Sequence, residues 1–416
     1  MKLLLVHQNF PGQYKHLAAR FGADPGVQVV AIGEQDNLSK RPDIPGVQRL
    51  AYRVAREVGK EIHPYLRNIE AAVLRGQAVA RIAMQLRAKG FVPDLICAHP
   101  AWGEALYLRE IFPDSRILAF FEFYYLSQGA DMGFDPEFPA TLDDHLRIRT
   151  WNMVQQSSFF SADAGITPTR WQASVYPAEF QAKMNIIHDG IDTDTLRPNP
   201  AARFPLSDGR FLTRSDEVIS FISRGLEPYR GFHIFMRALP DLMRRRPNAQ
   251  IVIVGGDIPS YGRRPKDAAN WREYLLREVG DKIDPNRLHF VGKIPYPAFV
   301  SLLQISRAHV YLSYPFVLSW SMLEAMAAGA PVIASRTPPV TEFIRHETNG
   351  LLFDFFDRQA LVEAVCRALD DADLSQALTR SARQTIVEGY DLERVCLPAQ
   401  IKLMHALARP LAEPNQ

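Results

Sequence analysis

Short, almost wholly apolar runs alternate along the chain with longer segments in which apolar residues recur at helical spacing. In the first half, the apolar runs predict strands at Leu3–Val6, Val27–Ile32, Asp94–Ala98, Ile117–Phe121, Ala164–Thr167 and Asn185–Ile187. The segments between them predict helices at Tyr14–Phe21, Glu61–Lys89, Trp102–Ile111, Thr141–Phe160 and Arg170–Tyr176. Strands without polar alternation are typical of a parallel sheet covered on both faces, so this half predicts a doubly wound α/β domain.

The alternation stops and then restarts in the second half. Strands are predicted at Val218–Ile222, Gln250–Val254, Leu288–Val291, His309–Leu312 and Pro331–Ala334. Helices are predicted at Phe232–Arg245, Trp271–Glu278, Ala298–Ser306 and Ser321–Ala328, and helical patterns dominate from Arg358 onward. We therefore predict an N-terminal domain over 1–188, a Gly- and Pro-rich linker over 189–214, a second α/β domain over 215–391 and a C-terminal helical segment over 392–416.

Composition narrows the class of protein. The 416 residues carry 48 Lys and Arg against 46 Asp and Glu, so overall charge gives no support for a nucleic-acid partner. Cys97, Cys366 and Cys396 lie far apart without CxxC spacing, which predicts neither a disulfide framework nor a zinc site and favours a reducing, cytoplasmic location. The apolar opening Leu3–Val6 is too short for a signal-peptide core or a membrane span.

The segment Tyr314–Ser335 is the strongest candidate for chemistry. A predicted strand ends near Tyr314, and Ser319, Trp320 and Ser321 lie where a helix begins. Free N–H groups at a helix start bind anions, which suits a diphosphate. The Glu324 carboxylate, in the first turns, could accept hydrogen bonds from a vicinal diol such as a ribose. The alternative is a buried helix in which Glu324 only complements the positive helix end.

Two arginines bracket a second strand-to-helix turn. Arg224 and Arg230 stand six residues apart in SRGLEPYRG, after the strand Val218–Ile222. Paired guanidinium groups can hold a diphosphate and stabilise charge on the leaving group. A pair of solvated loop arginines is the alternative. Gly12 and Gln13 follow the first strand in a similar turn, where a glycine allows close backbone approach to a ligand, although an ordinary tight turn would look the same.

Glu122 follows the apolar strand Ile117–Phe121 and lies among aromatic residues. A carboxylate in such surroundings is a functional-site candidate, unless backbone groups or an arginine satisfy it. Further donor-side candidates follow predicted strands of the second domain, namely Gly255, Gly256, Lys293 and Ile294. Acceptor-side candidates follow strands of the first domain, namely His99, Trp102, Tyr124 and Asp131. For each of these, a plain turn or a capped helix start is the alternative.

The segment LEAMAAGAPVIAS, residues 323–335, resembles the signature of the family 4 glycosyltransferases. This family has the GT-B fold, in which two Rossmann-like domains face each other across a cleft. The resemblance implies that Glu324 binds the ribose of a nucleotide-sugar donor, that Arg224 and Arg230 bind its diphosphate, and that the backbone at Lys293 and Ile294 meets the base. It also implies retention of anomeric configuration without a metal, and a C-terminal helix that crosses back to the N-terminal domain.

Two positions depart from the family pattern. Phe316 stands where the family usually has a glutamate that touches the donor sugar, and Glu122 stands where it often has a histidine. We predict that these changes are coupled, with Glu122 binding a sugar hydroxyl or orienting the acceptor. A GT-B nucleotide-sugar epimerase and a non-catalytic nucleotide-sugar binder remain alternatives. The run Asp192-Thr193-Asp194 mimics a metal-binding DxD motif but lies in the linker, so we predict no metal site.

The expected partners are a nucleotide-sugar donor, with UDP- or GDP-sugars favoured, and a glycan, lipid-linked or small-molecule acceptor. No other cofactor is predicted. The predicted helical stretch from Arg53 to Lys89 is rich in basic residues, which could dock on an anionic membrane. A solvated helix face is the alternative. The sequence thus predicts a cytoplasmic protein, with peripheral contact at the inner membrane face as a further hypothesis.

Overall fold

The computed structural model describes residues 1–408 as two compact units. The first unit comprises residues 1–189 together with the chain from Cys396 onward, and the second comprises Gly190–Val395. Each unit is built around a parallel sheet, which confirms the prediction of two doubly wound α/β domains. The last residues of the predicted C-terminal segment, 409–416, lie outside the described residues.

The first sheet has seven strands in the order β3-β2-β1-β4-β5-β6-β7, all parallel. Its strands are β1 (Lys2–Val6), β2 (Gln28–Glu34), β3 (Val47–Tyr52), β4 (Leu95–Ala98), β5 (Arg116–Phe120), β6 (Ala164–Thr167) and β7 (Met184–Ile186). The interior strand β1 is apolar from Leu3 to Val6 and fully buried there, because helices cover both faces of the sheet. In register, Leu3 of β1 pairs with Val29 of β2 and Leu95 of β4.

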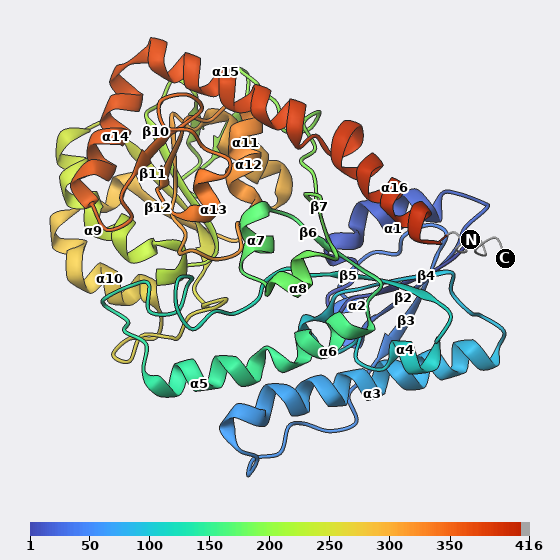
Figure 1. Ribbon diagram of the computed structural model, residues 1–416. Helices are drawn as coiled ribbons and strands as arrows, with labels where there is room; N and C mark the ends of the chain where they lie inside the picture. Colours follow the sequence, from blue (N-terminus) through green and yellow to red (C-terminus); the bar gives the residue numbers. More distant parts are fainter. Residues whose placement is uncertain (409–416) are drawn as a thin grey trace. The chain divides into compact units, whose positions relative to one another are not determined.

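Helices flank this sheet on either side (Figure 1), with α1 and α16 on one face and α3, α4 and α6 on the other. The helices of the first unit are α1 (Lys15–Gly22), α2 (Gln35–Leu38), α3 (Arg67–Ala88), α4 (Leu108–Ile111), α5 (Leu142–Trp151), α6 (Met153–Ser161), α7 (Arg170–Ser174), α8 (Ala178–Gln181) and α16 (Leu397–Ala408). The C-terminal helix α16 packs against α1, β4 and β5, so the end of the described chain completes the first unit.

The second sheet has six parallel strands in the order β12-β11-β10-β13-β14-β15. Its strands are β10 (Val218–Gly225), β11 (Gln250–Gly256), β12 (Leu288–Gly292), β13 (Ala308–Tyr311), β14 (Val332–Ser335) and β15 (Leu351–Phe353). The helices of this unit are α9 (Phe232–Arg245), α10 (Trp271–Val279), α11 (Tyr296–Ile305), α12 (Trp320–Ala328), α13 (Pro338–Thr341), α14 (Arg358–Asp370) and α15 (Ala372–Gly389).

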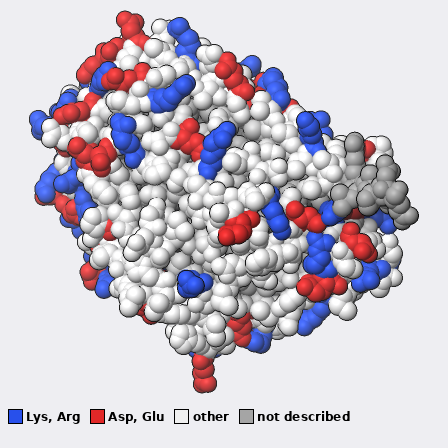
Figure 2. Space-filling model, in the orientation of Figure 1, with Lys and Arg blue, Asp and Glu red and all other residues white. Residues whose placement is uncertain are grey.

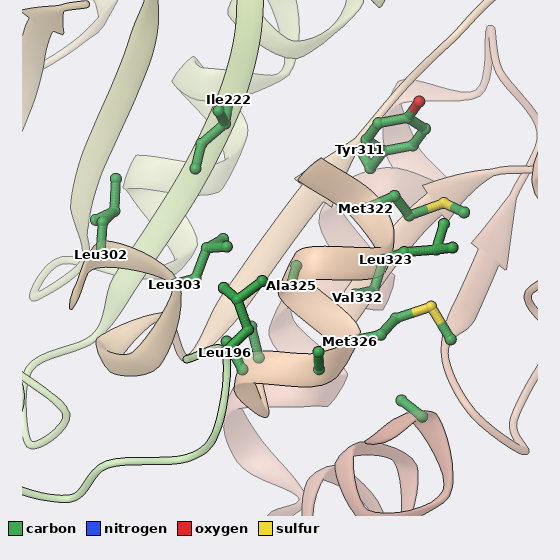
Figure 3. Packing of buried hydrophobic residues seen from close by; sticks show 14 of the residues in the cluster. Leu196, Ile222, Leu302, Leu303, Tyr311, Met322, Leu323, Ala325, Met326 and Val332 are labelled. Atoms are coloured by element: carbon green, nitrogen blue, oxygen red, sulfur yellow. The ribbon is translucent and has the colours of Figure 1, made fainter. Parts of the chain in front are cut away.

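The core of the second unit forms around α12, which is apolar on nearly every side. Figure 3 shows part of the buried cluster that contains Met322, Leu323 and Met326 of this helix together with Leu302 of α11 and Ile222 of β10. Small residues such as Ala325 let the helix approach its neighbours closely. Because the helix is anchored by this packing, its first turn has a fixed position at the carboxyl edge of the sheet.

Some elements differ from the sequence prediction. The predicted helix over residues 102–111 is reduced to a short 3₁₀ turn and α4, because Gly103 has φ +102° and its backbone approaches Ala72 too closely for any side chain. The edge strands β3 and β15 were not predicted. Polar residues interrupt the apolar pattern of β3, and β15 has only three apolar residues, too few to identify a strand. The expected linker contains a hairpin of β8 (Arg203–Pro205) and β9 (Phe211–Thr213).

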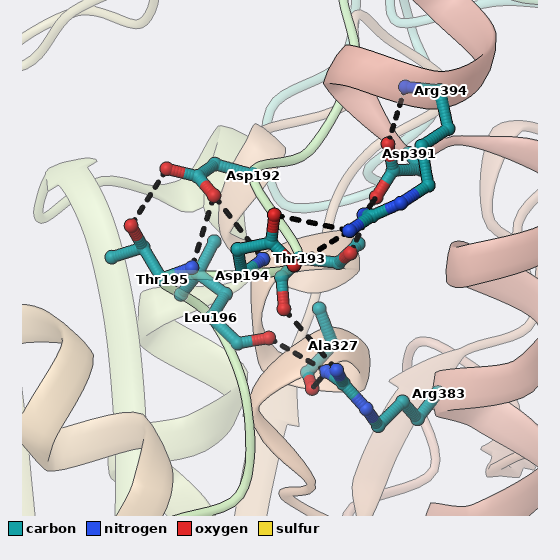
Figure 4. Close-up of polar contacts among 9 residues, drawn as sticks. All are labelled: Asp192, Thr193, Asp194, Thr195, Leu196, Ala327, Arg383, Asp391 and Arg394. Atoms are coloured by element: carbon teal, nitrogen blue, oxygen red, sulfur yellow. Dashed lines mark hydrogen bonds and ion pairs between the residues drawn. The ribbon is translucent and has the colours of Figure 1, made fainter.

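The acidic run at residues 192–194 is engaged by protein groups (Figure 4). Asp192 accepts hydrogen bonds from the Thr195 backbone and hydroxyl, and Asp194 pairs with Arg394 at 3.0 Å. The Thr193 hydroxyl donates to Asp391 at 2.5 Å. Through these contacts, the acidic run stabilises the structure of the second unit.

Surface charge is mixed in sign. On the face drawn in Figure 2, Lys and Arg side chains are interspersed with Asp and Glu, in line with the net charge of +2. Within residues 1–408, no helix combines the length and the apolarity that a membrane crossing requires.

Candidate functional site

The strand order of the second sheet creates a switch point between β10 and β13, where the connections leave in opposite directions. Ligands of such sheets bind at the carboxyl ends of these two strands. The predicted arginine turn follows β10, and the predicted loop with Ser319 follows β13. The fold therefore brings the two strongest sequence candidates to one edge of one sheet.

Arg230 bridges the two loops at this switch point. Its side chain is buried, and its Nη1 donates to Ser313 Oγ at 2.9 Å and to the Val317 carbonyl at 2.8 Å. The guanidinium carbon lies 5.2 Å from the ring centroid of Tyr261 and 5.8 Å from that of Phe316. Within the described part of the chain, Nε and Nη2 of Arg230 have no protein acceptor, so these donors can serve a ligand.

Phe316 forms part of the wall that holds Arg230. Its ring is 3% exposed and packs edge-on against Tyr261 at 4.8 Å and Tyr229 at 5.5 Å between ring centroids. The position where the family usually has a sugar-binding glutamate thus carries an apolar ring that contacts other aromatics. A carboxylate of this chain that binds the donor sugar would have to come from another position.

Glu227, which the sequence analysis did not single out, anchors the loop that carries Tyr261. Its side chain is fully buried, and Oε1 accepts from the Ser260 backbone N–H at 2.9 Å. Its Oε2 accepts from the N–H of Tyr261 at 3.1 Å and of Gly262 at 2.6 Å. These bonds set the Tyr261 ring over Arg230. Glu227 was visible between the two arginines, but nothing in its spacing indicated that it would bind a loop 33 residues away.

Replacing Glu227 with glutamine is expected to lower the free energy of unfolding by about 2 kcal/mol. The amide has the same shape, but its NH₂ group would face backbone N–H donors where Oε1 or Oε2 now accepts. Urea unfolding measures the loss. Glu278→Gln on α10 is the matched control, because that carboxylate pairs with Arg237 at the surface. Equal stability of the two variants would contradict the anchoring role of Glu227.

Two glycines at the end of β11 allow close packing, and one of them leaves room for a lysine. A Cβ placed on Gly256 would stand 2.9 Å from Lys293 Cε and 3.5 Å from the Arg224 carbonyl oxygen. The side chain of Lys293 therefore passes directly over Gly256, close to the backbone of Arg224, and both cationic side chains are exposed. A Cβ on Gly255 would meet Leu226 at 2.7 Å, so this glycine serves backbone packing. The neighbouring Ile294 is half-buried against the core.

The start of α12 is capped by Ser319, whose Oγ accepts from the Ser321 N–H at 3.4 Å. The Ser319 N–H donates to the Tyr311 hydroxyl at 2.9 Å, and Trp320 is 47% exposed. One turn on, Glu324 is half-buried, and its Oε1 accepts from Tyr296 OH at 3.1 Å.

Tyr296 is a second residue that sequence reasoning missed. Burial, with the Glu324 carboxylate adding to it, raises the pKa of Tyr296 well above its ordinary value. Tyr296 therefore remains a hydrogen-bond donor that orients Glu324. No sequence signal marked it, because it lies 28 residues before its partner, at the start of α11.

The first unit has its own switch point, between β1 and β4. Its carboxyl edge gathers Gln13, His99, Trp102 and Glu122, all predicted from the sequence. Glu122 Oε1 accepts from Gln13 Nε2 at 3.1 Å, and Glu122 Oε2 lies 3.6 Å from His99 Nε2. The buried His99 ring stacks on Trp102 with centroids 4.4 Å apart. The Glu122 side chain is 31% exposed, so a ligand can reach it.

His7 joins this cluster although the sequence analysis did not select it. Its Nε2 lies 2.7 Å from Gln13 Oε1, and its ring centroid lies 5.1 Å from that of His99. Burial and the neighbouring His99 lower the pKa of His7 to about 3. The available signal was its position directly after the first strand, level with His99 after β4.

Two acceptor-side candidates lie apart from the contacts of this cluster. Tyr124 is 8% exposed, its hydroxyl accepts from Gln156 Nε2 at 2.7 Å, and its ring packs against Tyr176. Asp131 is 3% exposed in the polar segment between β5 and α5. A role for either residue in acceptor binding stays a prediction.

Two family models match the chain in succession. Residues 25–196 match the glycosyl transferase family 4 group, and residues 207–385 match glycosyl transferases group 1. The second match contains the whole Arg230 site and α12, while the first covers most of the first unit.

Characterised relatives are similar over part of their length. A GDP-mannose-dependent α-(1-6)-phosphatidylinositol monomannoside mannosyltransferase of Mycobacterium tuberculosis is 28% identical over 231 residues, 54% of this chain and 56% of that protein. Glycogen synthase of the same species is 27% identical over 214 residues, 51% of this chain and 46% of that protein. The chain thus spans about half the length of the curated relatives it matches.

Solved structures match the fold over nearly the full chain. Sucrose-phosphate synthase from Thermosynechococcus elongatus has a TM-score of 0.73 at 17% identity, covering 98% of this chain and 99% of that one. Anabaena HepE in complex with UDP-glucose has a TM-score of 0.67 at 17% identity, covering 97% and 99%. The structural likenesses show the GT-B fold, and the two family models show that the chain belongs to the glycosyltransferases of the family 4 type.

Proposed function

We propose that this protein transfers a glycosyl group from a nucleoside diphosphate sugar to an acceptor hydroxyl, with retention of anomeric configuration. The observation that carries the proposal is Arg230, which is buried at the switch point of the second sheet with donors left for a ligand. Arginine held in this way is preorganised to bind a diphosphate and stabilise the charge that develops on it.

The second unit would bind the donor. Arg230, Arg224 and Lys293 supply positive charge for the diphosphate, and the N–H groups at the start of α12 add to it. Glu324, oriented by Tyr296, accepts hydrogen bonds from the ribose diol. Because these groups can neutralise the diphosphate, we propose that transfer requires no metal ion.

The chemical step is a substitution at the anomeric carbon. The acceptor oxygen bonds to this carbon on the face from which the diphosphate departs, and the bond from the carbon to the phosphate oxygen breaks. The electron pair of that bond stays with the diphosphate, and the acceptor proton passes to a leaving phosphate oxygen. Arg230 stabilises the negative charge on the departing group.

We assign Glu122 to the binding of a ligand hydroxyl, in exchange for the glutamate that Phe316 replaces. Its carboxylate is partly exposed and is held by Gln13 and by the nearby His99. The buried position of Phe316 among aromatic rings supports the idea that the donor sugar needs a carboxylate from elsewhere.

A nucleotide-sugar panel tests the function. The mannosyltransferase relative is named for GDP-mannose and the HepE structure contains UDP-glucose, so UDP- and GDP-sugars come first. Binding of a donor at 100 times its Kd is expected to add about 2.7 kcal/mol of stability, which a thermal-shift screen detects. Incubation with the donor and candidate acceptors then separates transfer or slow hydrolysis from epimerisation. Binding without any turnover would reduce the protein to a nucleotide-sugar binder.

Contact with an anionic membrane is a further proposal, since lipid-linked acceptors lie at membranes. The helices α5 and α6 expose Leu142, Leu146, Met153 and Phe160 at 74%, 51%, 54% and 77%, at spacings of four and seven residues along the chain. Arg149 is exposed on the same helix. An apolar stripe of this kind can insert among lipid headgroups.

The wild-type protein is expected to sediment with phosphatidylglycerol liposomes at low salt. The double variant Leu142→Ser, Phe160→Ser should lower the bound fraction several-fold. The change removes apolar area without altering charge. Ile258→Ser, at an exposed apolar residue of the second unit, is the matched control. Equal sedimentation of all variants, or none with the wild type, would contradict membrane contact.

A further inference from the structure

Three side chains form a directed chain of hydrogen bonds in the first unit. The Asn9 backbone N–H donates to His7 Nδ1 at 2.9 Å, so the neutral ring carries its proton on Nε2. That Nε2–H donates to Gln13 Oε1 at 2.7 Å. The amide of Gln13 is thereby oriented with its NH₂ group toward Glu122, where it donates to Oε1 at 3.1 Å.

The first member of this chain is held rigidly. A Cβ on Gly12, which has φ +47°, would stand 2.4 Å from His7 Cε1 and Nε2, so the backbone of the turn lies directly against the ring. The ring also packs against His99 and Trp102, at centroid distances of 5.1 and 5.3 Å. His7 is 2% exposed and therefore has no room for another rotamer.

The protonation of His7 is equally constrained. Burial and the neighbouring His99 lower its pKa to about 3, which keeps the ring neutral at neutral and mildly acidic pH. A neutral ring with Nδ1 occupied can only donate from Nε2, so the direction of the chain does not reverse. The last member, Glu122, also has its backbone carbonyl fixed by Gln172 Nε2 at 2.6 Å.

We propose that His7 and Gln13 are positioning residues, which act through Glu122 by turning its carboxylate so that Oε2 meets a ligand hydroxyl. This inference rests on the proposed function, which assigns Glu122 to hydroxyl binding. Gln13 was predicted from the sequence as a donor contact through its turn; the geometry points to a role through Glu122 instead.

A double-mutant cycle tests the proposal. Gln13→Met keeps the length of the side chain and removes both hydrogen bonds, and Glu122→Gln keeps the shape of the carboxylate and removes its charge. The readout is kcat/KM for hydrolysis or transfer with UDP-glucose or GDP-mannose, whichever shifts the melting temperature more. We expect Gln13→Met to lower kcat/KM about 10-fold in the wild type and less than about 2-fold in the Glu122→Gln background.

Controls separate positioning from loss of structure. Gln77→Met makes the same change at an exposed site on α3 and should leave kcat/KM unaltered. His7→Phe keeps an aromatic ring and loses the donor, so it should show the same dependence on Glu122 and serves if Gln13→Met fails to fold.

The outcomes distinguish the two proposals. One result would overturn the positioning role alone: Glu122→Gln clearly lowers kcat/KM, but Gln13→Met lowers kcat/KM by the same factor in the wild-type and Glu122→Gln backgrounds. Glu122→Gln without effect would overturn the hydroxyl-binding role of Glu122 and the positioning role with it. A Gln13→Met effect that vanishes in the Glu122→Gln background supports both.

Discussion

Replacing Arg230 with methionine is expected to lower kcat/KM for nucleotide-sugar turnover by about 100- to 1,000-fold, the loss usual for one donor to developing negative charge. Methionine can fill the space between Tyr261 and Phe316, so the change removes the charge and the donors with little loss of packing. The loss of two hydrogen bonds, to Ser313 and Val317, will lower stability modestly. Kinetics with saturating donor, alongside a melting curve, separate the two effects.

Arg244→Met on α9 is the matched control for this prediction. Its guanidinium is 74% exposed and pairs with Asp241 on the surface of the same unit. It should leave kcat/KM unaltered. An Arg230→Met variant that is folded and fully active would remove the observation on which the proposed function rests.

Acidification is expected to destabilise both units well before carboxylates titrate. Burial lowers the pKa of His7 to about 3, of His188 to about 4 and of His309 to about 3. In the unfolded chain each histidine titrates near its ordinary pKa of 6.5. Between that value and the folded pKa, the unfolded state binds more protons, so the free energy of unfolding falls as pH falls.

The size of this effect follows from the pKa difference. Each histidine lowers the free energy of unfolding by about 2 kcal/mol at pH 5 relative to pH 7.5. The first unit, with His7 and His188, therefore loses about 4 kcal/mol of stability, and the second unit, with His309, loses about 2 kcal/mol. Urea unfolding followed by circular dichroism at several pH values measures both. His309→Asn should weaken the pH dependence of the second unit's free energy of unfolding. His63→Asn, at an exposed site, should leave the pH dependence of both units as it is in the wild type. A free energy of unfolding that is constant from pH 7.5 to 5 would contradict the prediction.

Much of the fold could be predicted because its strands are buried on both faces. The strand at Ala164–Thr167 and the helix at Phe232–Arg245 have the predicted bounds, and most others differ by a few residues. The predictions failed at edge strands such as β3, whose partial exposure removes the apolar run. They also failed where Gly103 ends a helix through close packing against Ala72, a contact that no local pattern reveals.

The candidate site was predictable in its parts. Glu122, Arg230 and Glu324 lie in the segments that follow β5, β10 and β13, and the carboxyl ends of parallel strands face one edge of a sheet, so local sequence order was enough to select them. Their partners were not predictable in the same way. Tyr296 and Glu227 bind groups about 30 residues away in the chain.

The order of apolar and polar residues by itself determined two parallel α/β units and the turns that carry the cationic groups. The resemblance of residues 323–335 to a known signature indicated the family. Only the tertiary structure decided that Arg230 is held between Ser313 and the aromatic rings, and that Glu122 is approached by Gln13 and His99. The reason is physical: a strand or helix is selected by residues near in sequence, whereas the orientation and protonation of a buried side chain depend on groups that folding brings to it.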